Sequence, residues 1–149
     1  MKEFKRIKPN IKLHPKKLIL LAGAGQNVGK TTFACQVIQH IKSLHHKVYA
    51  IKISPHFHEK NPPKTIFTSE QFILSLEDKK DSRKDTGRML KAGADEVFFL
   101  QVTDEHLKEA FEYTMSFIPS DAFVVIESGA LRELIKPALF FFLKNSNSQ

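Results

Sequence analysis

The sequence contains a single cysteine and no long apolar run. Cys35 is alone among 149 residues, so no disulfide forms within the chain, and a reducing compartment, the cytoplasm, is the expected location. No apolar stretch approaches the roughly 20 residues that a bilayer-spanning helix requires. A short apolar run, 18–24, follows a basic start, but the pattern after it is not that of a cleavage site. We therefore expect neither a signal peptide nor a membrane partner.

The sequence also lacks internal repeats and any linker that would separate two domains. Hydrophobic residues make up 42% and charged residues 26%, which is typical of a folded globular chain. We predict one domain over residues 18–149. Residues 1–17 form a basic lead-in, because they hold seven of the 23 lysines and arginines against one acidic residue, Glu3. No groove-reading helix accompanies these charges, which favours a solvated segment over a patch that binds nucleic acid.

Hydrophobic periodicity predicts strands and helices in alternation. Strands are predicted at 17–22, 48–53, 71–76, 96–102, 122–126 and 138–143, and helices at 31–44, 86–92, 104–115 and 130–135. Residues 54–69 are predicted to form a loop, since Pro62 and Pro63 interrupt regular structure. Strands that alternate with helices are typical of crossover connections. The pattern indicates a three-layer α/β fold with a mainly parallel sheet and helices on both faces.

A phosphate-binding loop pattern follows the first predicted strand and opens the first predicted helix. It consists of Ala24, Gly25, Gln26, Asn27, Val28, Gly29, Lys30 and Thr31, and Thr32 continues it. Gly25 and Gly29 permit the backbone angles that turn successive N–H groups toward a phosphate. Lys30 can reach the β- and γ-phosphates, and the Thr31 hydroxyl is a ligand for Mg²⁺. The strand and helix around the loop favour a P-loop NTPase-type domain that binds GTP or ATP.

A carboxylate that helps to hold the magnesium ion is expected at the end of a neighbouring apolar strand. Glu127 follows the apolar residues 123–126 and is the best candidate. Asp85 is a second candidate, for a contact to a magnesium-bound water or on the phosphate side. The predicted metal-binding residues are therefore Thr31, Glu127 and Asp85, and the predicted catalytic residues are Lys30 and Glu127.

Two histidines and the single cysteine also have side chains that can bind metals or react, but their sequence patterns are less specific. His56 and His58 follow the second predicted strand and lie at the carboxyl end of the sheet, where ligands bind in open α/β folds. Two histidines at this spacing, with no cysteine nearby, fall short of a metal site. Cys35 lies inside the first predicted helix and is expected to be a buried packing residue.

Three segments resemble the B-protein family of molybdopterin–guanine dinucleotide biosynthesis (MobB). The first is the loop through Thr32, the second is the segment 84–94 and the third is the apolar strand 121–127. The second segment is the most specific, because Lys-Asp-Thr is followed after five residues by Ala-Gly-Ala. The resemblance covers roughly residues 18–143. It implies a P-loop GTP-binding protein with an accessory role in molybdenum cofactor maturation, a partner enzyme and a homodimer. No Asn-Lys-x-Asp motif for guanine is present, so GTP and ATP both stay open.

Two other functions use the same loop. One is a small-molecule kinase, which needs arginines to clamp the transferred phosphoryl group, and after residue 6 the chain has only Arg83, Arg88 and Arg132. The other is a non-catalytic module in which nucleotide switches a partner surface. We expect slow hydrolysis or none, because no residue in the sequence is a convincing candidate for positioning an attacking water.

Overall fold

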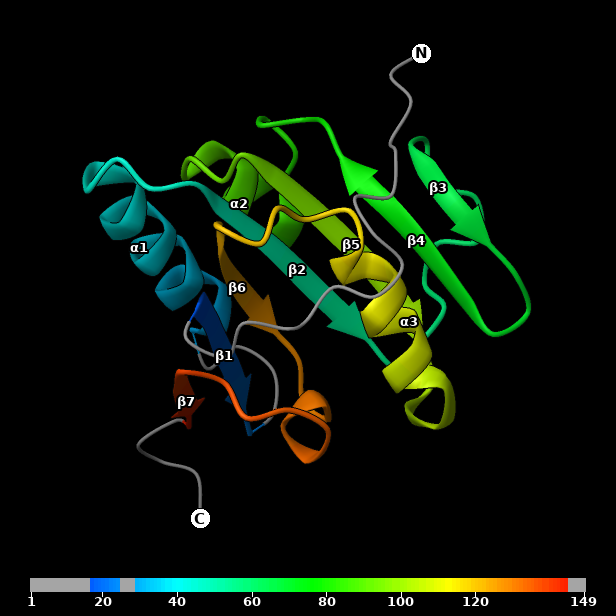
Figure 1. Ribbon diagram of the computed structural model, residues 1–149. Coiled ribbons are helices and arrows are strands. Elements are labelled where there is room, and N and C mark those ends of the chain that lie inside the picture. Colours follow the sequence, from blue (N-terminus) through cyan, green and yellow to red (C-terminus); the bar gives the residue numbers. More distant parts are fainter. Residues whose placement is uncertain (1–16, 25–28, 145–149) are drawn as a thin grey trace.

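The computed structural model describes residues 17–24 and 29–144, and these form an α/β fold around a seven-stranded sheet (Figure 1). The strands are β1 Leu18–Gly23, β2 Val48–Ser54, β3 Thr65–Thr68, β4 Phe72–Glu77, β5 Glu96–Val102, β6 Phe123–Glu127 and β7 Leu139–Leu143. Their order across the sheet is β3-β4-β5-β2-β6-β1-β7. The neighbours from β5 to β7 run parallel, whereas β3 and β4 pair antiparallel with each other and β4 pairs antiparallel with β5. The sheet is therefore mostly parallel, as predicted.

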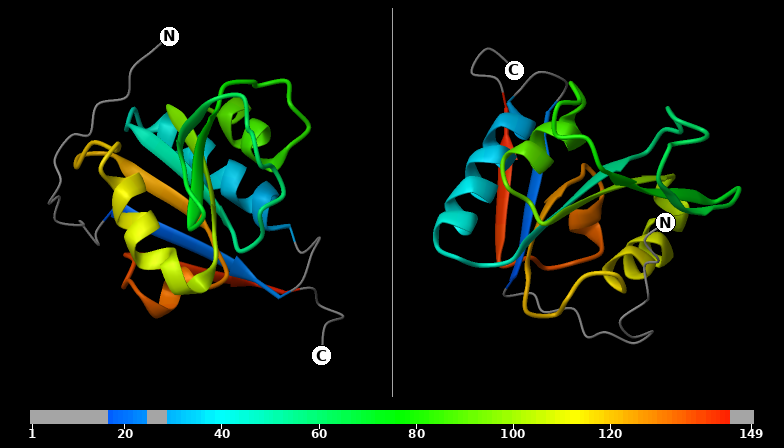
Figure 2. Two further views of the ribbon diagram at one scale, coloured as in Figure 1. Left: turned by 90° about the vertical axis from the view of Figure 1, so that its right-hand side faces the viewer. Right: turned by 90° about the horizontal axis from the view of Figure 1, so that it is seen from above.

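Helices cover both faces of this sheet (Figure 2). The α-helices are α1 Lys30–Ser43, α2 Asp85–Lys91 and α3 Leu107–Met115, and the 3₁₀ turns are η2 Asp104–His106 and η3 Leu131–Glu133. Helices α1 and α2 pack on one face against an apolar cluster that includes Ile38 and Val125. Helix α3 and turn η3 pack on the other face against a larger cluster that includes Phe98. The predicted three layers are thus present.

Three predictions of secondary structure were wrong. Residues 54–69 were predicted to form a loop, but Thr65–Thr68 form β3, because pairing with β4 at the sheet edge stabilises a segment with weak hydrophobic periodicity. The predicted helix 104–115 begins as the 3₁₀ turn η2 and becomes α-helical only at Leu107. The predicted helix 130–135 is the three-residue turn η3. The basic residues 1–16 lie outside the described part of the chain.

The chain connections create a topological switch point between β1 and β6. These two strands are parallel neighbours. The connection after β1 runs through α1 on one face and leads to β2, beyond β6. The connection after β6 runs through η3 on the opposite face and leads to β7, beyond β1. In open α/β sheets, ligands bind in the crevice outside the carboxyl ends of two strands whose connections diverge in this way. The fold alone therefore draws attention to the ends of β1 and β6.

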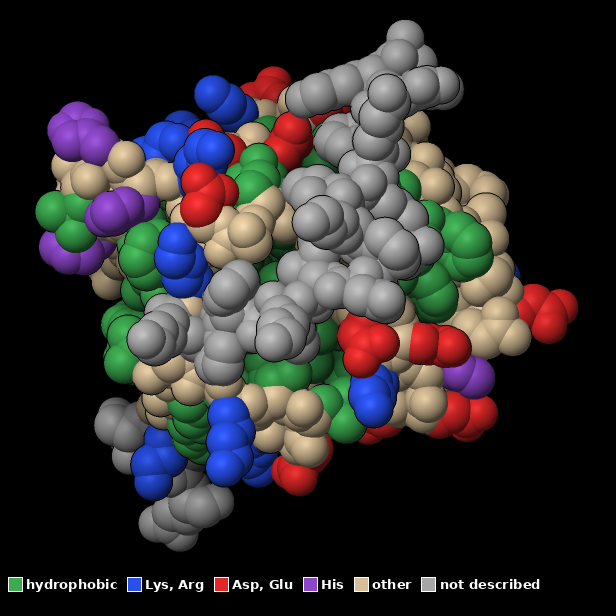
Figure 3. All heavy atoms as spheres, in the orientation of Figure 1, with side chains coloured by type: hydrophobic (Ala, Val, Ile, Leu, Met, Phe, Trp, Pro, Cys, Tyr) green, Lys and Arg blue, Asp and Glu red, His purple; other side chains and the backbone are tan. Residues whose placement is uncertain are grey.

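Figure 3 shows how charged side chains are distributed over one face of the described residues. On the face drawn in Figure 3, cationic and anionic side chains are interspersed, which differs from the one-sign surface expected of a polyanion-binding domain. Within residues 17–24 and 29–144, no helix has the length and apolar character needed to cross a membrane.

Candidate functional site

The start of helix α1 meets the end of strand β1 at the switch point. Gly29 precedes the helix with φ 84°, a left-handed angle that suits glycine, and its carbonyl accepts a hydrogen bond from the Phe33 N–H at 2.9 Å. Within the described residues, no side chain caps the first N–H groups of α1, and such groups at a helix start are suited to meet an anion. Of the predicted loop, Ala24 is exposed at the end of β1, while Gly25, Gln26, Asn27 and Val28 lie outside the described residues.

A buried hydrogen bond joins helix α1 to strand β6. The Thr31 hydroxyl donates to Glu127 Oε1 at 2.9 Å. Thr31 is 7% exposed and Glu127 is 5% exposed. Glu127 is the last residue of β6, so a buried carboxylate stands at the carboxyl end of a strand that has parallel neighbours on both sides. The two residues were both predicted as metal ligands, and the fold brings their side-chain oxygens together across 96 positions of sequence.

Lys52 of strand β2 supplies the cation that accompanies this carboxylate. Lys52 is the direct neighbour of Glu127 in the parallel register of β2 and β6, and its ammonium lies 3.1 Å from Glu127 Oε2. It also donates a hydrogen bond to Asp85, the first residue of α2. One half-buried ammonium is thus shared by two carboxylates. A carboxylate pair so close together is favourable only with a cation between them.

The pKa shifts follow from this arrangement. Burial raises the pKa of Asp85, but its hydrogen bond to the Lys52 ammonium and the charge of that group outweigh burial, so the pKa lies below the usual 3.8. The nearby Thr31 hydroxyl and the charge of Arg88 act in the same direction. Burial lowers the pKa of Lys52, but the carboxylates of Glu127 and Asp85 outweigh it and the pKa lies above the usual 10.5. Lys52 and Asp85 are therefore both charged at neutral pH.

Arg88 of α2 connects this charged cluster to Thr32, the residue that follows Thr31 on α1. Its guanidinium donates to Thr32 Oγ1 at 2.8 Å and lies 3.9 Å from Asp85 Oδ1. Arg88 is exposed on its outer side. The guanidinium has five N–H donors, so it can donate a hydrogen bond to a further acceptor, such as a phosphate oxygen.

A cavity of about 760 Å³ opens beside these residues, and we call it the switch-point cavity. Its lining includes Lys30 of α1, Glu127 of β6, and His56 and His58, which follow β2. The two imidazole rings lie 5.7 Å apart. The histidines are thus at the carboxyl end of the sheet, as predicted. In the described residues, no group of three or more histidine, cysteine or acidic side chains could hold a metal ion by itself.

The donor set nevertheless fits Mg²⁺. Its oxygens come from the Thr31 hydroxyl and from the carboxylates of Glu127 and Asp85, and Mg²⁺ prefers oxygen. This ion usually takes one or two carboxylates and completes its shell with water and substrate phosphates, so a full cage of protein ligands is not required. The residues present therefore suit a magnesium–phosphate complex better than a resident structural metal.

Prediction from the sequence missed two members of this cluster. Lys52 and Arg88 are not part of the phosphate-loop pattern, and neither was predicted as a site residue. The signal for Lys52 was available, because a lysine interrupts an otherwise apolar strand. Arg88 carried no such signal, since a helix of seven residues with one arginine looks like any exposed helix.

Cys35 lies one turn beyond Thr31 on α1 and is half-buried. Burial raises the pKa of its thiol above the usual 9.0, and the carboxylates of Glu127 and Asp85 add to this, against the opposing effect of Arg88. A thiol with a raised pKa is a poor nucleophile at neutral pH. Cys35 packs against the apolar cluster beneath α1 and α2, but it is only half-buried, whereas the sequence predicted a buried packing residue.

Comparison of this chain with models of protein families, with curated proteins and with solved structures finds no match. The interpretation of the cluster consequently rests on its own geometry and chemistry.

Proposed function

We propose that the chain is a P-loop NTPase-type protein that binds a nucleoside triphosphate, GTP or ATP, together with Mg²⁺ at the switch point. One observation carries this proposal: the 2.9 Å contact between Thr31 Oγ1 and Glu127 Oε1. It places a hydroxyl from the start of a helix beside a buried carboxylate at the end of the adjacent strand, which is the oxygen pair that a magnesium–phosphate complex uses.

In this proposal each residue has a separate role. The amides of residues 24–29 and the start of α1 surround the phosphates, and Lys30 neutralises the β- and γ-phosphates. Thr31 and Glu127 hold the ion, which supplies charge neutralisation when it is bound, and Asp85 contacts it through water. Lys52 keeps the two carboxylates close together in the absence of ligand. Hydrolysis is expected to be slow or absent, because no side chain of this cluster is assigned to an attacking water.

The biological role follows only from the resemblance of three segments. Loop residues through Thr32, the segment 84–94 and the strand 121–127 resemble the MobB family. We therefore propose an accessory role in molybdenum cofactor maturation, beside a partner enzyme and as a homodimer. The geometry of the cluster supports nucleotide binding independently of this role, so the two parts of the proposal can fail separately.

Replacing Lys30 by alanine tests the nucleotide site. The loss of an ammonium that contacts phosphate is expected to weaken GTP or ATP binding by about 10- to 100-fold, the size of one or two charged hydrogen bonds. Isothermal titration of the parent and of Lys30→Ala, each with and without Mg²⁺, measures the effect. Comparing GTP with ATP in the same series decides which base is preferred.

Lys108→Ala is the matched control, since Lys108 is exposed on α3 at the opposite face of the sheet. Its affinity for nucleotide should equal that of the parent. Equal affinity of Lys30→Ala and the parent would show that the phosphates bind elsewhere or not at all.

A small-molecule kinase is the second candidate function, favoured by a second cavity that shares Lys52 with the switch-point cavity. In such an enzyme the terminal phosphoryl group moves to an acceptor hydroxyl, the nucleoside diphosphate leaves and the hydroxyl proton is released. Turnover that depends on an added acceptor supports the kinase. Tight nucleotide binding with no turnover supports a non-catalytic module that nucleotide switches.

A further inference from the structure

The second cavity, which we call the side cavity, has a volume of about 570 Å³, and the ring of Phe99 lies against it. Phe99 is in the middle of β5 and is only half-buried, whereas Val97 and Gln101, its neighbours on the same face of this strand, are fully buried. An aromatic ring in the middle of a sheet that still contacts water has apolar area left to bury. A cavity of this size, with apolar walls and a few polar groups, is typical of a small-molecule site.

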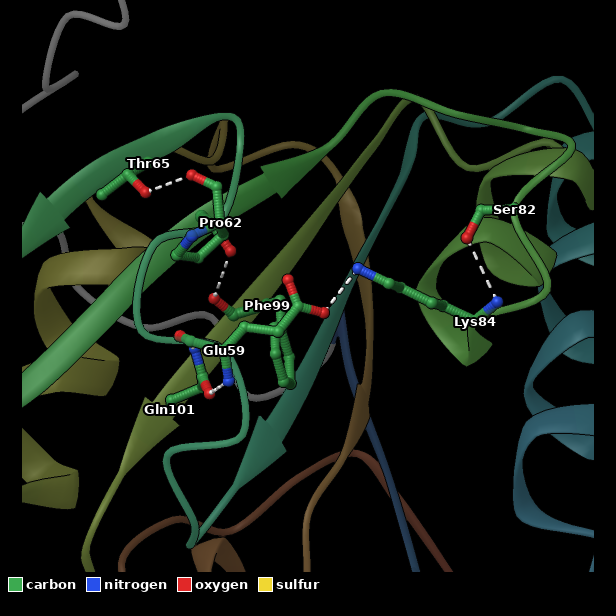
Figure 4. Close-up of polar contacts among 8 residues, drawn as sticks. Glu59, Pro62, Thr65, Ser82, Lys84, Phe99 and Gln101 are labelled. Carbon is green, nitrogen blue, oxygen red and sulfur yellow. Dashed lines mark hydrogen bonds and ion pairs between the residues drawn. The ribbon is translucent and has the colours of Figure 1, made fainter.

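One wall of the side cavity is the connection between β2 and β3, and hydrogen bonds hold it in place. The side chain of Gln101 accepts from the Glu59 N–H at 2.9 Å and donates to the Glu59 carbonyl at 2.7 Å. The Thr65 hydroxyl donates to the Pro62 carbonyl at 2.6 Å. Figure 4 shows these contacts beside the Phe99 ring. This wall is therefore preformed, as the walls of small-molecule sites usually are.

Another wall is the loop before α2, which is pressed against that helix. A Cβ atom on Gly87 would lie 2.6 Å from the Ser82 Cβ and 2.7 Å from the Ser82 carbonyl, so only glycine permits this approach. Lys84 reaches from this loop to Glu59, with 2.5 Å between Nζ and Oε1 (Figure 4). An ion pair thus joins the two walls.

Eight charged side chains line the side cavity, and they are not all paired. Five of them belong to ion pairs, which are Lys84 with Glu59, Lys52 with Asp85, and Asp78 with Lys64, a residue outside the cavity. The other three, Lys79, Arg83 and Glu77, have no ion pair within the described residues. Two cations against one carboxylate leave one positive charge of the lining unmatched.

The two unpaired cations are also more accessible than the unpaired carboxylate. Lys79 and Arg83 are both exposed in the loop before α2. Glu77 is half-buried, and its Oε1 atom is closed off from solvent. A ligand in the side cavity therefore meets two cationic groups at the loop and an apolar surface at Phe99.

From these features we propose that the side cavity binds a small monoanion, a carboxylate attached to a flat apolar ring system. The ring packs against Phe99 and beside Pro62 and Pro63, which supply apolar contact without free rotors. The carboxylate pairs with the guanidinium of Arg83, whose planar fork of donors matches two carboxylate oxygens. The ammonium of Lys79 adds a second positive charge beside it.

Other classes of ligand use these features less completely. A dianionic phosphate exceeds the single unmatched positive charge, and it would be repelled by the carboxylates of the lining, which are Glu59, Glu77, Asp78 and Asp85. A neutral ring leaves the two cations without a partner. The proposal does not require the proposed function, because the switch-point cavity shares only Lys52 and Phe99 with the side cavity.

The probe is 2-naphthoate, which carries one carboxylate on two fused rings. The chain contains no tryptophan, so naphthalene fluorescence reports binding with little background from the protein. Titration of the full chain should saturate below about 1 mM, the weak end of specific binding. The neutral analogue 2-naphthamide should bind roughly tenfold more weakly, because it cannot form the charged hydrogen bonds.

The Arg83→Gln variant tests the role of the guanidinium. It should bind naphthoate roughly tenfold more weakly than the parent, while its affinity for naphthamide should be unchanged. Arg132→Gln is the matched control, since Arg132 is an exposed arginine of turn η3 on the opposite face of the sheet, and it should bind both probes like the parent. The exposed position of Arg83 makes unfolding of the variant an unsuitable explanation, and equal melting curves verify this.

Lys30→Ala separates the two sites. It should retain the affinity of the parent for naphthoate even where it no longer binds triphosphate, so the failure of one proposal leaves the other intact. Loss of naphthoate binding in Lys30→Ala would place the probe in the switch-point cavity and overturn the assignment. The proposal is also overturned if naphthoate does not saturate, if naphthamide binds as tightly as naphthoate, or if Arg83→Gln binds naphthoate like the parent.

Discussion

On the α3 face of the sheet the buried strand side chains are apolar, whereas the face beneath α1 and α2 carries polar ones from the same strands. Strand side chains alternate between the two faces, so each polar residue has an apolar neighbour that points the other way. The polar strand residues on the α1–α2 face are Lys52, Ser54, Ser75, Glu77, Gln101 and Glu127, and apolar residues of the opposite face include Leu20, Ile51, Leu74, Phe98, Leu100 and Ile126.

The two faces of the sheet therefore have different roles: the apolar face stabilises the fold, and the polar face carries the charged side chains. The α3 face buries a continuous apolar cluster, which is the main source of folding free energy. On the other face, burial of Lys52 between two carboxylates loses hydration that the ion pairs only partly restore. A half-buried charge cluster is therefore poor evidence for stability. Its position at the switch point is better explained by a ligand.

The largest expected effect comes from breaking the apolar face. Phe111 of α3 is 2% exposed and packs in the larger cluster. Phe111→Ala is expected to lower the free energy of unfolding by about 3–5 kcal/mol, because it removes buried area and leaves a cavity. Urea unfolding measures the change. The exposed Phe142, replaced by alanine, should cost far less; similar losses at the two positions would contradict the assignment of the core to this face.

A smaller effect on stability, with a larger effect on binding, is expected on the polar face. Glu127→Gln removes one partner of Lys52 and weakens the contact to Thr31, so the free energy of unfolding should fall by about 1–3 kcal/mol. In the proposed function Mg²⁺ increases nucleotide affinity, and this increase should disappear because Glu127 is a proposed ligand of the ion. Titration with and without Mg²⁺ measures this.

Glu112→Gln on the exposed side of α3 is the matched control for that variant. It should retain both the stability of the parent and its dependence on Mg²⁺. If Glu127→Gln retains that dependence as well, the carboxylate does not contact the ion.

Much of the fold follows from the sequence, because the buried strands are continuous apolar runs with clear limits. The strand 96–102 was predicted with its observed bounds. Helix α1 is shifted from its prediction by one residue at both ends, and β2 is one residue longer than predicted. Strand β3 was missed because its residues are half-buried at the sheet edge and its pairing with β4 is a tertiary effect. Local pattern cannot report a partner that lies elsewhere in the chain.

Only part of the candidate site was predicted, because the sequence shows local patterns but not which strands pair. Thr31 and Glu127 each follow a strong local pattern, and the parallel sheet brings them together. Lys52 was missed because its role depends on register: only the pairing of β2 with β6 places it beside Glu127. The second cavity, which shares Lys52 with the switch-point cavity, was not predicted either, because residues from several separate segments line it and no motif marks it.

The smallest expected effect is the dependence of stability on acid at the polar face. The pKa of Asp85 lies below its usual 3.8 in the folded chain, so the unfolded chain binds this proton first as pH falls. The stabilising contribution of Asp85 is complete above that usual value and is lost as pH falls through the folded value. Asp85→Asn lacks this contribution at every pH. The stability difference between the parent and Asp85→Asn should therefore be largest near pH 7 and shrink below about pH 4.

Urea unfolding of the two proteins at a series of pH values between neutral and acid tests this expectation. Subtracting one free energy of unfolding from the other cancels the contributions of the carboxylates that both proteins have. Asp81→Asn provides the comparison, because Asp81 is exposed in the loop before α2 and has no ion pair among the described residues. Its difference from the parent should stay small throughout. A difference for Asp85→Asn that does not shrink in acid would mean that Lys52 does not hold this carboxylate in its charged form. The ammonium would then serve Glu127 alone, and the polar face would contain one ion pair instead of a shared cation.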